Sequence, residues 1–393
     1  MFPTIGDLVQ YIFHLHIVIP IQTFGFFVAL SFFVTYFVFV SEFKRKEADG
    51  LIAAYTEKEE IGLPASFLEL VVNGLLGFVL GFKISGAVIH HRAFTNDPVG
   101  FLFSTQGNLW AGLLFGSAFA FWIYIDRKKQ QLPKPKIVER TVHPYQLMGY
   151  LAFALGFFGF IGAKLFNTAE NFRLFLHHPL NTLFSTNGFT YYGGLIFGSL
   201  TYLYICHKKG MKLVHLADIG SPGMMLAYGI GRIGCHLAGD GDWGIVNLNH
   251  KPDWLTWLPD WMWAFKFPHN AIDAGVQIPG CIGLYCEQLR QGVYPTSFYE
   301  AVICISLFGL MWMLRKKIRI PGLMFYLFLI LNGGERILIE TIRVNQRYDV
   351  LGLDLTQAEM IGAAMVLGGL TGIGFLIYRH AKLRKRMDFS KNT

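Results

Sequence analysis

Long apolar segments separated by short charged connections run along the whole chain, and this pattern predicts membrane-spanning helices. A helix needs about 20 mostly apolar residues to cross a bilayer. We predict about nine spans, near residues 16–40, 67–89, 109–125, 145–166, 191–206, 220–238, 297–314, 320–342 and 357–378. The chain is therefore expected to be an all-α integral membrane protein with one multi-span domain over residues 1–393.

Basic residues in the connections predict the orientation of the spans. With the N-terminus outside, 23 Lys and Arg residues fall in the cytoplasmic connections and the C-terminal tail, and seven fall outside. Cytoplasmic connections carry such an excess in membrane proteins, so the N-terminus is expected outside and the C-terminus in the cytoplasm. The net charge of +8 lies mostly beside apolar spans. It therefore indicates a lipid bilayer as the partner and no nucleic acid.

The longest outer connection, residues 239–296, is rich in tryptophan. It holds five of the eight tryptophans, namely Trp243, Trp254, Trp257, Trp261 and Trp263. Indole side chains favour the headgroup region, so we expect an outer-face loop lying on the membrane, with substrate recruitment as an alternative. The same loop contains Cys281 and Cys286, and an oxidising compartment permits a disulfide without requiring one. Because no clustered His or Cys set accompanies them, neither a metal nor a cofactor is predicted.

Two segments of the chain resemble each other. Residues 102–117 match 183–199 with one gap, and the flanking residues extend the likeness to 75–129 and 156–209. Each copy reads as a span, a loop and a span, so duplication followed by divergence is the simplest account, with 75–129 the degenerate copy. The second copy carries Gly193 and Gly194 where the first has Ala111 and Gly112. Paired glycines permit close approach of a ligand, or they simply pack helices.

Four cations lie within the predicted spans: Lys83, Lys164, Arg232 and Arg336. A cation at membrane depth costs about 3 kcal/mol or more, so such residues usually line a polar cavity and face a partner, often an anion. We therefore expect the protein to handle a negatively charged group inside the membrane.

Two arginine-containing segments carry the candidate chemistry. Arg232 lies in the segment Gly231–Gly244, which also contains Asp240 and Asp242. A guanidinium matches a phosphate through two hydrogen bonds and stays charged, although a structural Arg–Asp pair is the alternative. In the second segment, Arg336, Glu340 and Arg343 are spaced to share one helix face. They form either an anion site or a self-satisfied ladder of ion pairs.

These segments together resemble the bacterial prolipoprotein diacylglyceryl transferases. The resemblance covers about residues 145–375 in family order, with a weaker match at the first span. It is carried by Gly231–Gly244, Tyr191–Ile196, Tyr294–Glu300 and Arg336–Arg343. Three departures stand out: Phe24-Gly25 replaces the family's Tyr-Gly, Tyr192 replaces its His, and Cys235-His236 replaces its Asn-Phe, with one extra residue before Trp243-Gly244.

The resemblance implies a reaction and its participants. Such enzymes transfer the diacylglyceryl group of phosphatidylglycerol to the lipobox cysteine of a prolipoprotein, in the bacterial inner membrane with the site toward the outer leaflet. A thioether forms and glycerol phosphate leaves. The resemblance also implies roles by position. Arg232 is the main phosphate clamp, Arg336 the second cation, and Asp240 the acid that orients Arg232 or the headgroup. Gly193 and Gly194 admit the headgroup, and Glu300, Glu340 and Arg343 complete the substrate site. Tyr192, which replaces the family's His, is expected to donate a hydrogen bond instead of acting as a base.

The sequence leaves the proton acceptor and two other functions open. His236, Glu300 or Asp240 is a candidate base, and a positive field that lowers the thiol pKa without a dedicated base is our preferred hypothesis. A transporter for an anionic solute would also use repeats and intramembrane charges. A lipid-binding scaffold without catalysis is the third possibility.

Overall fold

The chain is mostly helical in its computed structural model, which describes residues 1–15, 19, 21–96, 98–184, 188, 190–345, 347–350 and 352–391. Within this part of the chain, nine helices have 18 residues or more: α2 (Thr23–Ala48), α3 (Phe67–Ile89), α6 (Leu109–Gln130), α7 (Met148–Glu170), α10 (Tyr191–Lys208), α11 (Leu213–Ala238), α12 (Thr296–Leu314), α13 (Leu323–Glu340) and α14 (Gln357–Lys391). One helix falls on each predicted span. Residues 16–18 and 20, where the first predicted span begins, lie outside the described residues.

Six of these helices are long and apolar enough to cross a membrane, namely α2, α3, α6, α7 with the turn before it, α12 and α14. The expectation of a multi-span helical protein is confirmed at that level, while nine spans and their orientation stay predictions. The chain is mostly helical as the all-α prediction requires, but that prediction did not include any β-strands. Three two-stranded antiparallel ribbons are also present in the described residues: β1 (Tyr55–Ile61) with β2 (Lys136–Val142), β3 (Val276–Gln277) with β4 (Glu287–Gln288), and β5 (Arg347–Val350) with β6 (Leu353–Thr356).

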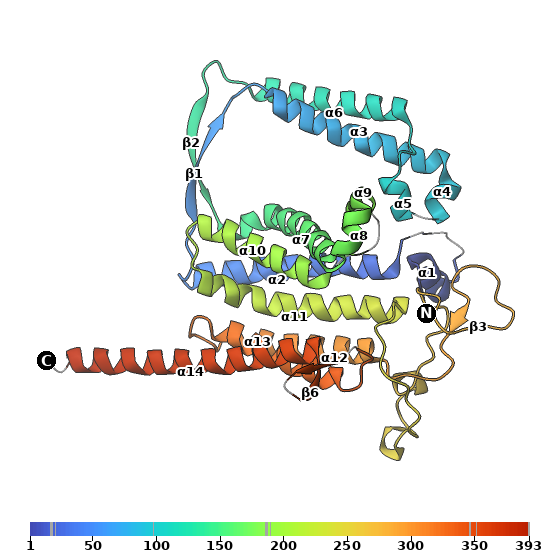
Figure 1. Ribbon diagram of the computed structural model, residues 1–393. Helices are drawn as coiled ribbons and strands as arrows, with labels where there is room; N and C mark the ends of the chain where they lie inside the picture. Colours follow the sequence, from blue (N-terminus) through green and yellow to red (C-terminus); the bar gives the residue numbers. More distant parts are fainter. Residues whose placement is uncertain are drawn as a thin grey trace. The chain divides into compact units, whose positions relative to one another are not determined.

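The chain divides into two compact units. Unit 1 contains Met1–Ile17, Ile21–Ile52 and Leu203–Thr393, and unit 2 contains Val18–Pro20 and Ala53–Tyr202. In unit 1, α11 packs against α2, α12 and α13, and α14 packs along α13. Figure 1 shows α11, α12, α13 and α14 as a group of long helices. The short helix α1 (Ile5–Phe13) precedes α2.

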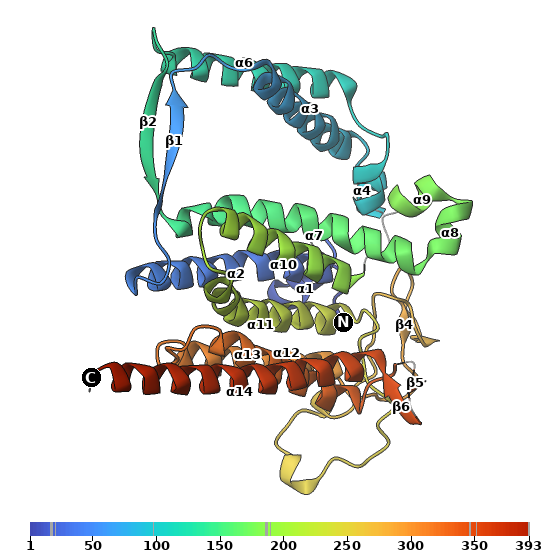
Figure 2. The same cartoon turned by 60° about the vertical axis from the view of Figure 1, so that its left-hand side comes forward.

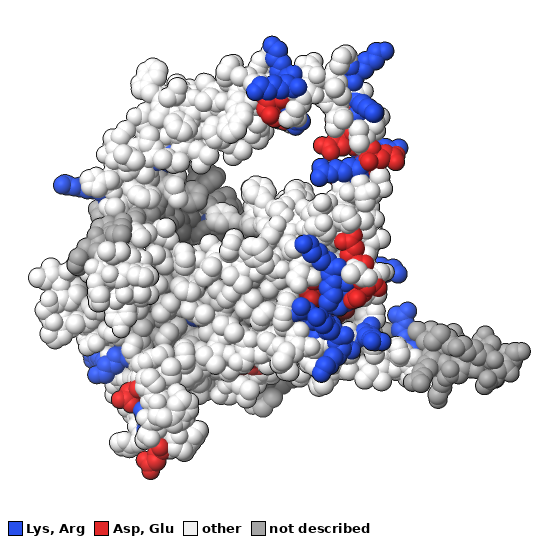
Figure 3. All heavy atoms as spheres, turned by 180° about the vertical axis from the view of Figure 1, so that it is seen from behind, with Lys and Arg blue, Asp and Glu red and all other residues white. Residues whose placement is uncertain are grey.

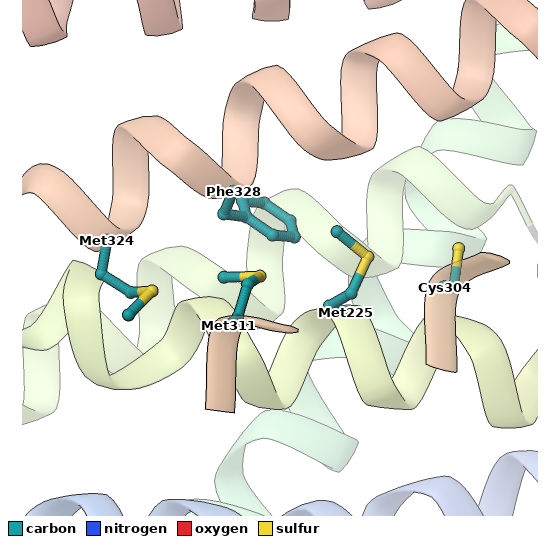
Figure 4. Close-up of a cluster of buried hydrophobic side chains, with 5 residues drawn as sticks. All are labelled: Met225, Cys304, Met311, Met324 and Phe328. Carbon is teal, nitrogen blue, oxygen red and sulfur yellow. The ribbon is translucent and has the colours of Figure 1, made fainter. Parts of the chain in front are cut away.

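The core of unit 1 lies where α11, α12 and α13 meet. Met225, Cys304, Met311, Met324 and Phe328 are buried there and point toward one another (Figure 4). The flexible methionine side chains fill the space between the three helices. This packing fixes the helices that carry the arginines described below.

A charged network closes one end of the helices of unit 1. Glu42 of α2 is buried and accepts hydrogen bonds from Arg45, while Arg315 after α12 lies 3.0 Å from the same carboxylate. Asp218 of α11 accepts backbone N–H groups at the start of α13 and pairs with Lys46 at 3.3 Å. Figure 3 shows Lys and Arg side chains gathered beside Asp and Glu side chains on one face of the molecule. These contacts tie α2, α11, α12 and α13 together at the end predicted to face the cytoplasm.

Unit 2 contains the first hairpin of the predicted repeat and the second one as far as Tyr202. Its other elements are α4 (His91–Asn96), α5 (Pro98–Phe103), η1 (Pro144–Leu147), α8 (Phe172–His177) and α9 (Pro179–Phe184). The β1–β2 ribbon leads from the α3–α6 pair to the start of α7, as Figure 2 shows. Its strands contain both β-branched and charged residues, and most of these residues are exposed.

Corresponding glycines bring the helices of each hairpin into backbone contact. A Cβ on Gly162 of α7 would lie 2.5 Å from the carbonyl oxygen of Gly193 and 2.5 Å from the Cβ of Phe197. A Cβ on Gly81 of α3 would lie 2.7 Å from the carbonyl oxygen of Ala111 and 2.6 Å from the Cβ of Phe115. The two hairpins therefore make the same contacts at equivalent positions. Residues 185–187 and 189 of the second copy lie outside the described residues.

Replacing Gly193 by alanine is expected to destabilise unit 2. The new methyl group would lie 2.3 Å from the carbonyl oxygen of Gly162, so α7 and α10 would have to separate. Overpacking of this kind costs about 1–3 kcal/mol. Thermal unfolding in detergent would show a lower midpoint for Gly193→Ala than for Gly149→Ala, because a Cβ on Gly149 of α7 meets nothing within 4 Å. Equal midpoints would contradict the packing role.

Lys83 has its partners within its own hairpin. Its Nζ donates to the carbonyl oxygens of Phe101, Ser104 and Gln106, at 2.8, 2.5 and 3.1 Å. The partner expected for this cation is therefore a set of backbone oxygens, from α5 and from the segment before α6. Backbone carbonyls satisfy an ammonium group with three N–H donors, so Lys83 holds the hairpin loop.

The outer loop between α11 and α12 is ordered by short turns and one disulfide. It contains η2 (Asp253–Leu255) and η3 (Asp260–Met262), and Cys281 is bonded to Cys286. Trp254 and Trp257 are each 75% exposed, whereas Trp261 packs against Phe298 of α12. The tryptophans therefore divide into an exposed pair and a packed group. The membrane-surface position of the loop stays a prediction.

Candidate functional site

A buried glutamate on α12 is the centre of the candidate site. Glu300 is fully buried, and its Oε1 accepts hydrogen bonds from Arg336 Nη1 at 2.8 Å and from Arg343 Nη1 at 3.2 Å. Its Oε2 lies 2.9 Å from Arg232 Nε. One carboxylate thus contacts three guanidinium groups, and the first and last of these, Arg232 and Arg343, are more than 100 residues apart in the chain. Arg232 and Arg336, predicted to meet, do meet on this group.

The hydroxyl group of Tyr228 links the same side chains. It donates to Glu300 Oε1 at 3.2 Å and accepts from Arg232 Nη2 at 3.1 Å and from Arg336 Nη1 at 3.3 Å. The Arg232 guanidinium also lies over the Tyr228 ring, 4.9 Å from its centroid. Sequence reasoning missed Tyr228, although its position four residues before Arg232 places both on one face of α11.

Asp242 forms a second bridge between two of the arginines. Its carboxylate pairs with Arg232 Nη1 through one oxygen and with Arg343 Nη2 through the other. Burial alone would raise the pKa of Asp242, but the charges of Arg232 and Arg343 outweigh it and hold the pKa below its ordinary value. Arg232, Glu300, Arg343 and Asp242 therefore form a closed ring of alternating charges.

The end of α11 places Asp242 in this ring. Gly239 caps the helix with φ +66°, a left-handed conformation that glycine adopts without strain, and its N–H donates to Cys235 O at 3.0 Å. The chain then turns back toward α12, where Thr296 Oγ1 donates to Asp242 O at 3.1 Å. This change of chain direction after α11 brings the loop, and with it Asp242, back to the arginines.

Glu340 supports Arg336 from the same helix. The two residues pair at 3.7 Å one turn apart, as their spacing predicted. Asn345 Nδ2 donates to Glu340 Oε1 at 2.5 Å. Glu300, Asp242 and Glu340 together give three carboxylates, as many as there are arginines in the cluster. The cluster is therefore balanced in charge when all six groups are ionised.

The other predicted residues lie apart from these contacts. Asp240, the acid expected beside Arg232, accepts the N–H of Asp242 at 3.3 Å, and the ion pair to Arg232 is made by Asp242. Burial and the nearby Asp242 charge raise the pKa of Asp240. Tyr192, Gly193 and Gly194 lie in α10 within unit 2. The two glycines face α7, where Gly193 approaches Gly162 and Gly194 approaches Gly159.

His236, a candidate base, is enclosed by aromatic rings. Trp261, Phe265, Phe267 and Phe298 surround its imidazole at centroid distances of 5.6–6.0 Å. Its Nδ1 lies 3.5 Å from Ser297 Oγ. These contacts place His236 in the packing between α11, α12 and the outer loop.

Among the described residues, one set of donor atoms is close enough to hold a metal ion: Cys235, Asp240 and Asp242, within 4.8 Å of one another. Asp242 already pairs with two guanidinium groups, which oppose a cation. The arrangement suits an anion better.

The Arg232 and Arg336 side chains retain 13% and 20% exposure, so they are not sealed by protein. A pocket of about 470 Å³ lies elsewhere in unit 1, between α1 and the outer loop.

Comparison with known proteins identifies relatives across most of the chain. A family model described as "Prolipoprotein diacylglyceryl transferase" matches residues 110–375. A phosphatidylglycerol–prolipoprotein diacylglyceryl transferase of Sodalis glossinidius is 29% identical over 303 residues, which cover 74% of this chain and 97% of the relative. Proteins of the same name from Vibrio vulnificus and Thermus thermophilus are 28% and 31% identical, covering 70% and 53% of this chain and 89% and 76% of the relatives.

Proposed function

Because the chain belongs to the prolipoprotein diacylglyceryl transferase family, we propose that it transfers the diacylglyceryl group of phosphatidylglycerol to the lipobox cysteine of a prolipoprotein in the bacterial inner membrane. The observation that carries the proposal is the convergence of Arg232, Arg336 and Arg343 on Glu300 among apolar helices. Cations inside apolar segments usually line a polar cavity and face a partner, and the partner proposed for them is a lipid phosphate.

The proposed reaction breaks a C–O bond while an S–C bond forms. The thiol sulfur attacks the glyceryl carbon, and the electron pair of the C–O bond passes to the phosphate oxygen. The proton lost by the thiol balances the charge of the departing glycerol phosphate. Fixed guanidinium groups stabilise this growing negative charge most strongly where water is excluded. Arg232 is the main clamp and Arg336 the second cation.

The remaining residues support this arrangement. Glu300, Glu340 and Tyr228 hold the arginines at fixed positions, and Arg343 completes the anion site. Asp240 orients the headgroup or the loop that carries Asp242. For Tyr192 the proposed role is donation of a hydrogen bond, and for Gly193 and Gly194 it is admission of the headgroup, as the family resemblance implies. We place the site toward the outer leaflet, with the N-terminus outside, because of the asymmetry in Lys and Arg.

No dedicated base is expected for the thiol, because the arginine field lowers its pKa. His236→Phe should fold, since its surroundings are aromatic. We expect His236→Phe and Tyr192→Phe each to retain the shape of the wild-type pH profile of kcat/KM. Loss of a pH-dependent limb in either variant, with phosphatidylglycerol still bound, would instead identify a base.

The transfer itself is tested with purified protein, labelled phosphatidylglycerol and a lipobox peptide. Label on the peptide thiol, absent when the cysteine is replaced by serine, supports the proposed function. Anion flux into vesicles without labelling of the peptide would favour a transporter. Lipid binding with neither result would favour a scaffold.

A further inference from the structure

Two carboxylates bridge the same pair of arginines. Glu300 joins Arg232 to Arg343 from α12 and is fully buried. Asp242 joins the same two guanidinium groups from the loop after α11, and its side chain is 33% exposed. Each carboxylate uses both oxygens for the bridge. The ring thus contains an inner anion that is enclosed and an outer anion that is open to its surroundings.

The two anions differ in how easily they leave the ring. Glu300 is held by α12 and by four side-chain contacts, from three arginines and Tyr228. Asp242 lies in a loop and follows Gly241, whose φ is +100°. Its backbone is tied by Thr296 and Asp240, so rotation of the side chain alone releases both arginines. The outer bridge is therefore exchangeable without moving a helix.

We propose that the outer face of the Arg232–Arg343 pair is the phosphate subsite, and that Asp242 fills it until the lipid phosphate replaces the carboxylate. This inference rests on the proposed function. A phosphodiester and a carboxylate each carry one negative charge and present two oxygens, and both suit paired guanidinium groups. Exchanging one for the other leaves no buried arginine without an anion at either stage. Asp242 returns when glycerol phosphate leaves and so competes against rebinding of the product.

The proposal makes Arg343 a direct phosphate ligand and gives Asp242 a role distinct from that of a structural partner. A structural partner strengthens the site, so its loss weakens anion binding. A competing anion occupies the site, so its loss strengthens anion binding. The two roles therefore predict opposite signs for the same substitution.

Asp242→Asn decides between them, because asparagine keeps the size of the side chain and removes its charge. Glycerol phosphate is the probe, and its affinity is measured from ligand-induced stabilisation in detergent. The variant should bind glycerol phosphate about tenfold more tightly than the wild type. The corresponding change in binding free energy is near the low end of the values for a hydrogen bond to a charged group. The KM for phosphatidylglycerol should fall in parallel. Weaker or unchanged binding would overturn the proposal.

Two further variants make the test specific. Asp260→Asn makes the same change in the same loop, where Asp260 pairs with Lys251, and it should bind glycerol phosphate like the wild type. Asp242→Glu keeps the charge and should not tighten binding, so tightening there would count against the proposal. The binding measurement needs no turnover. If the wild type labels no peptide, the proposed function fails, while Asp242→Asn still judges the anion exchange.

Discussion

Glu300→Gln is expected to abolish transfer and to destabilise unit 1 by about 3–5 kcal/mol, the usual consequence of breaking a buried ion pair. Glutamine has the same shape, but its amide cannot neutralise the three guanidinium groups that meet at this position. The loss of charge leaves buried arginines without their inner anion. Unfolding in detergent, monitored by temperature or denaturant, measures the effect on stability, and peptide labelling measures the effect on activity.

Removing one arginine in the same protein provides the matched control. In Glu300→Gln/Arg336→Gln, one uncompensated cation is gone, so the double variant should be less destabilised than the sum of the two single changes. Side chains that share an ion pair couple in this way. Additive effects would show that Glu300 does not neutralise Arg336, and wild-type stability of Glu300→Gln would remove it from the centre of the site.

The long helices and the meeting of the arginines were predictable from the sequence because each rests on a local or one-dimensional signal. Apolar length located the helices. The spacing of Arg336 and Glu340 predicted a contact that the structure contains. Arg232 and Arg336 are both cations inside apolar segments, so they were expected to converge on one cavity. Apolar length, helical spacing and charge within a span can all be read without knowing the conformation of any loop.

The choice between Asp240 and Asp242 depends on loop geometry that spacing does not encode. The positive φ angles at Gly239 and Gly241 set which carboxylate returns to Arg232. Asp240 aligns with the acidic residue of the family signature, and the extra residue of this chain lies between it and Trp243. The resemblance therefore favoured Asp240, whereas the structure pairs Asp242 with the arginines. The β1–β2 ribbon was missed for another reason, since the run of charged residues in β1 has the composition of a polar connection and only a few β-branched residues indicate a strand.

Arg232→Lys should keep the positive charge and the fold yet lower kcat/KM about hundredfold, the scale of losing one preorganised donor to a developing anion. The guanidinium uses all three nitrogens: Nε toward Glu300, Nη1 toward Asp242 and Nη2 toward Tyr228. A lysine ammonium is one nitrogen on a flexible chain and cannot span these groups. Initial rates of peptide labelling over a range of phosphatidylglycerol concentrations separate kcat from KM.

Arg290→Lys, at an exposed position of the outer loop, makes the same chemical change away from the cluster and should retain wild-type rates. A charge effect alone would leave Arg232→Lys equally active, because lysine supplies the same charge to the cavity. Near-normal turnover by Arg232→Lys would therefore mean that phosphate is held by charge without the planar fork of donors. The bidentate clamp, and with it the similarity of the Asp242 carboxylate to the lipid phosphate, would then lose its physical basis.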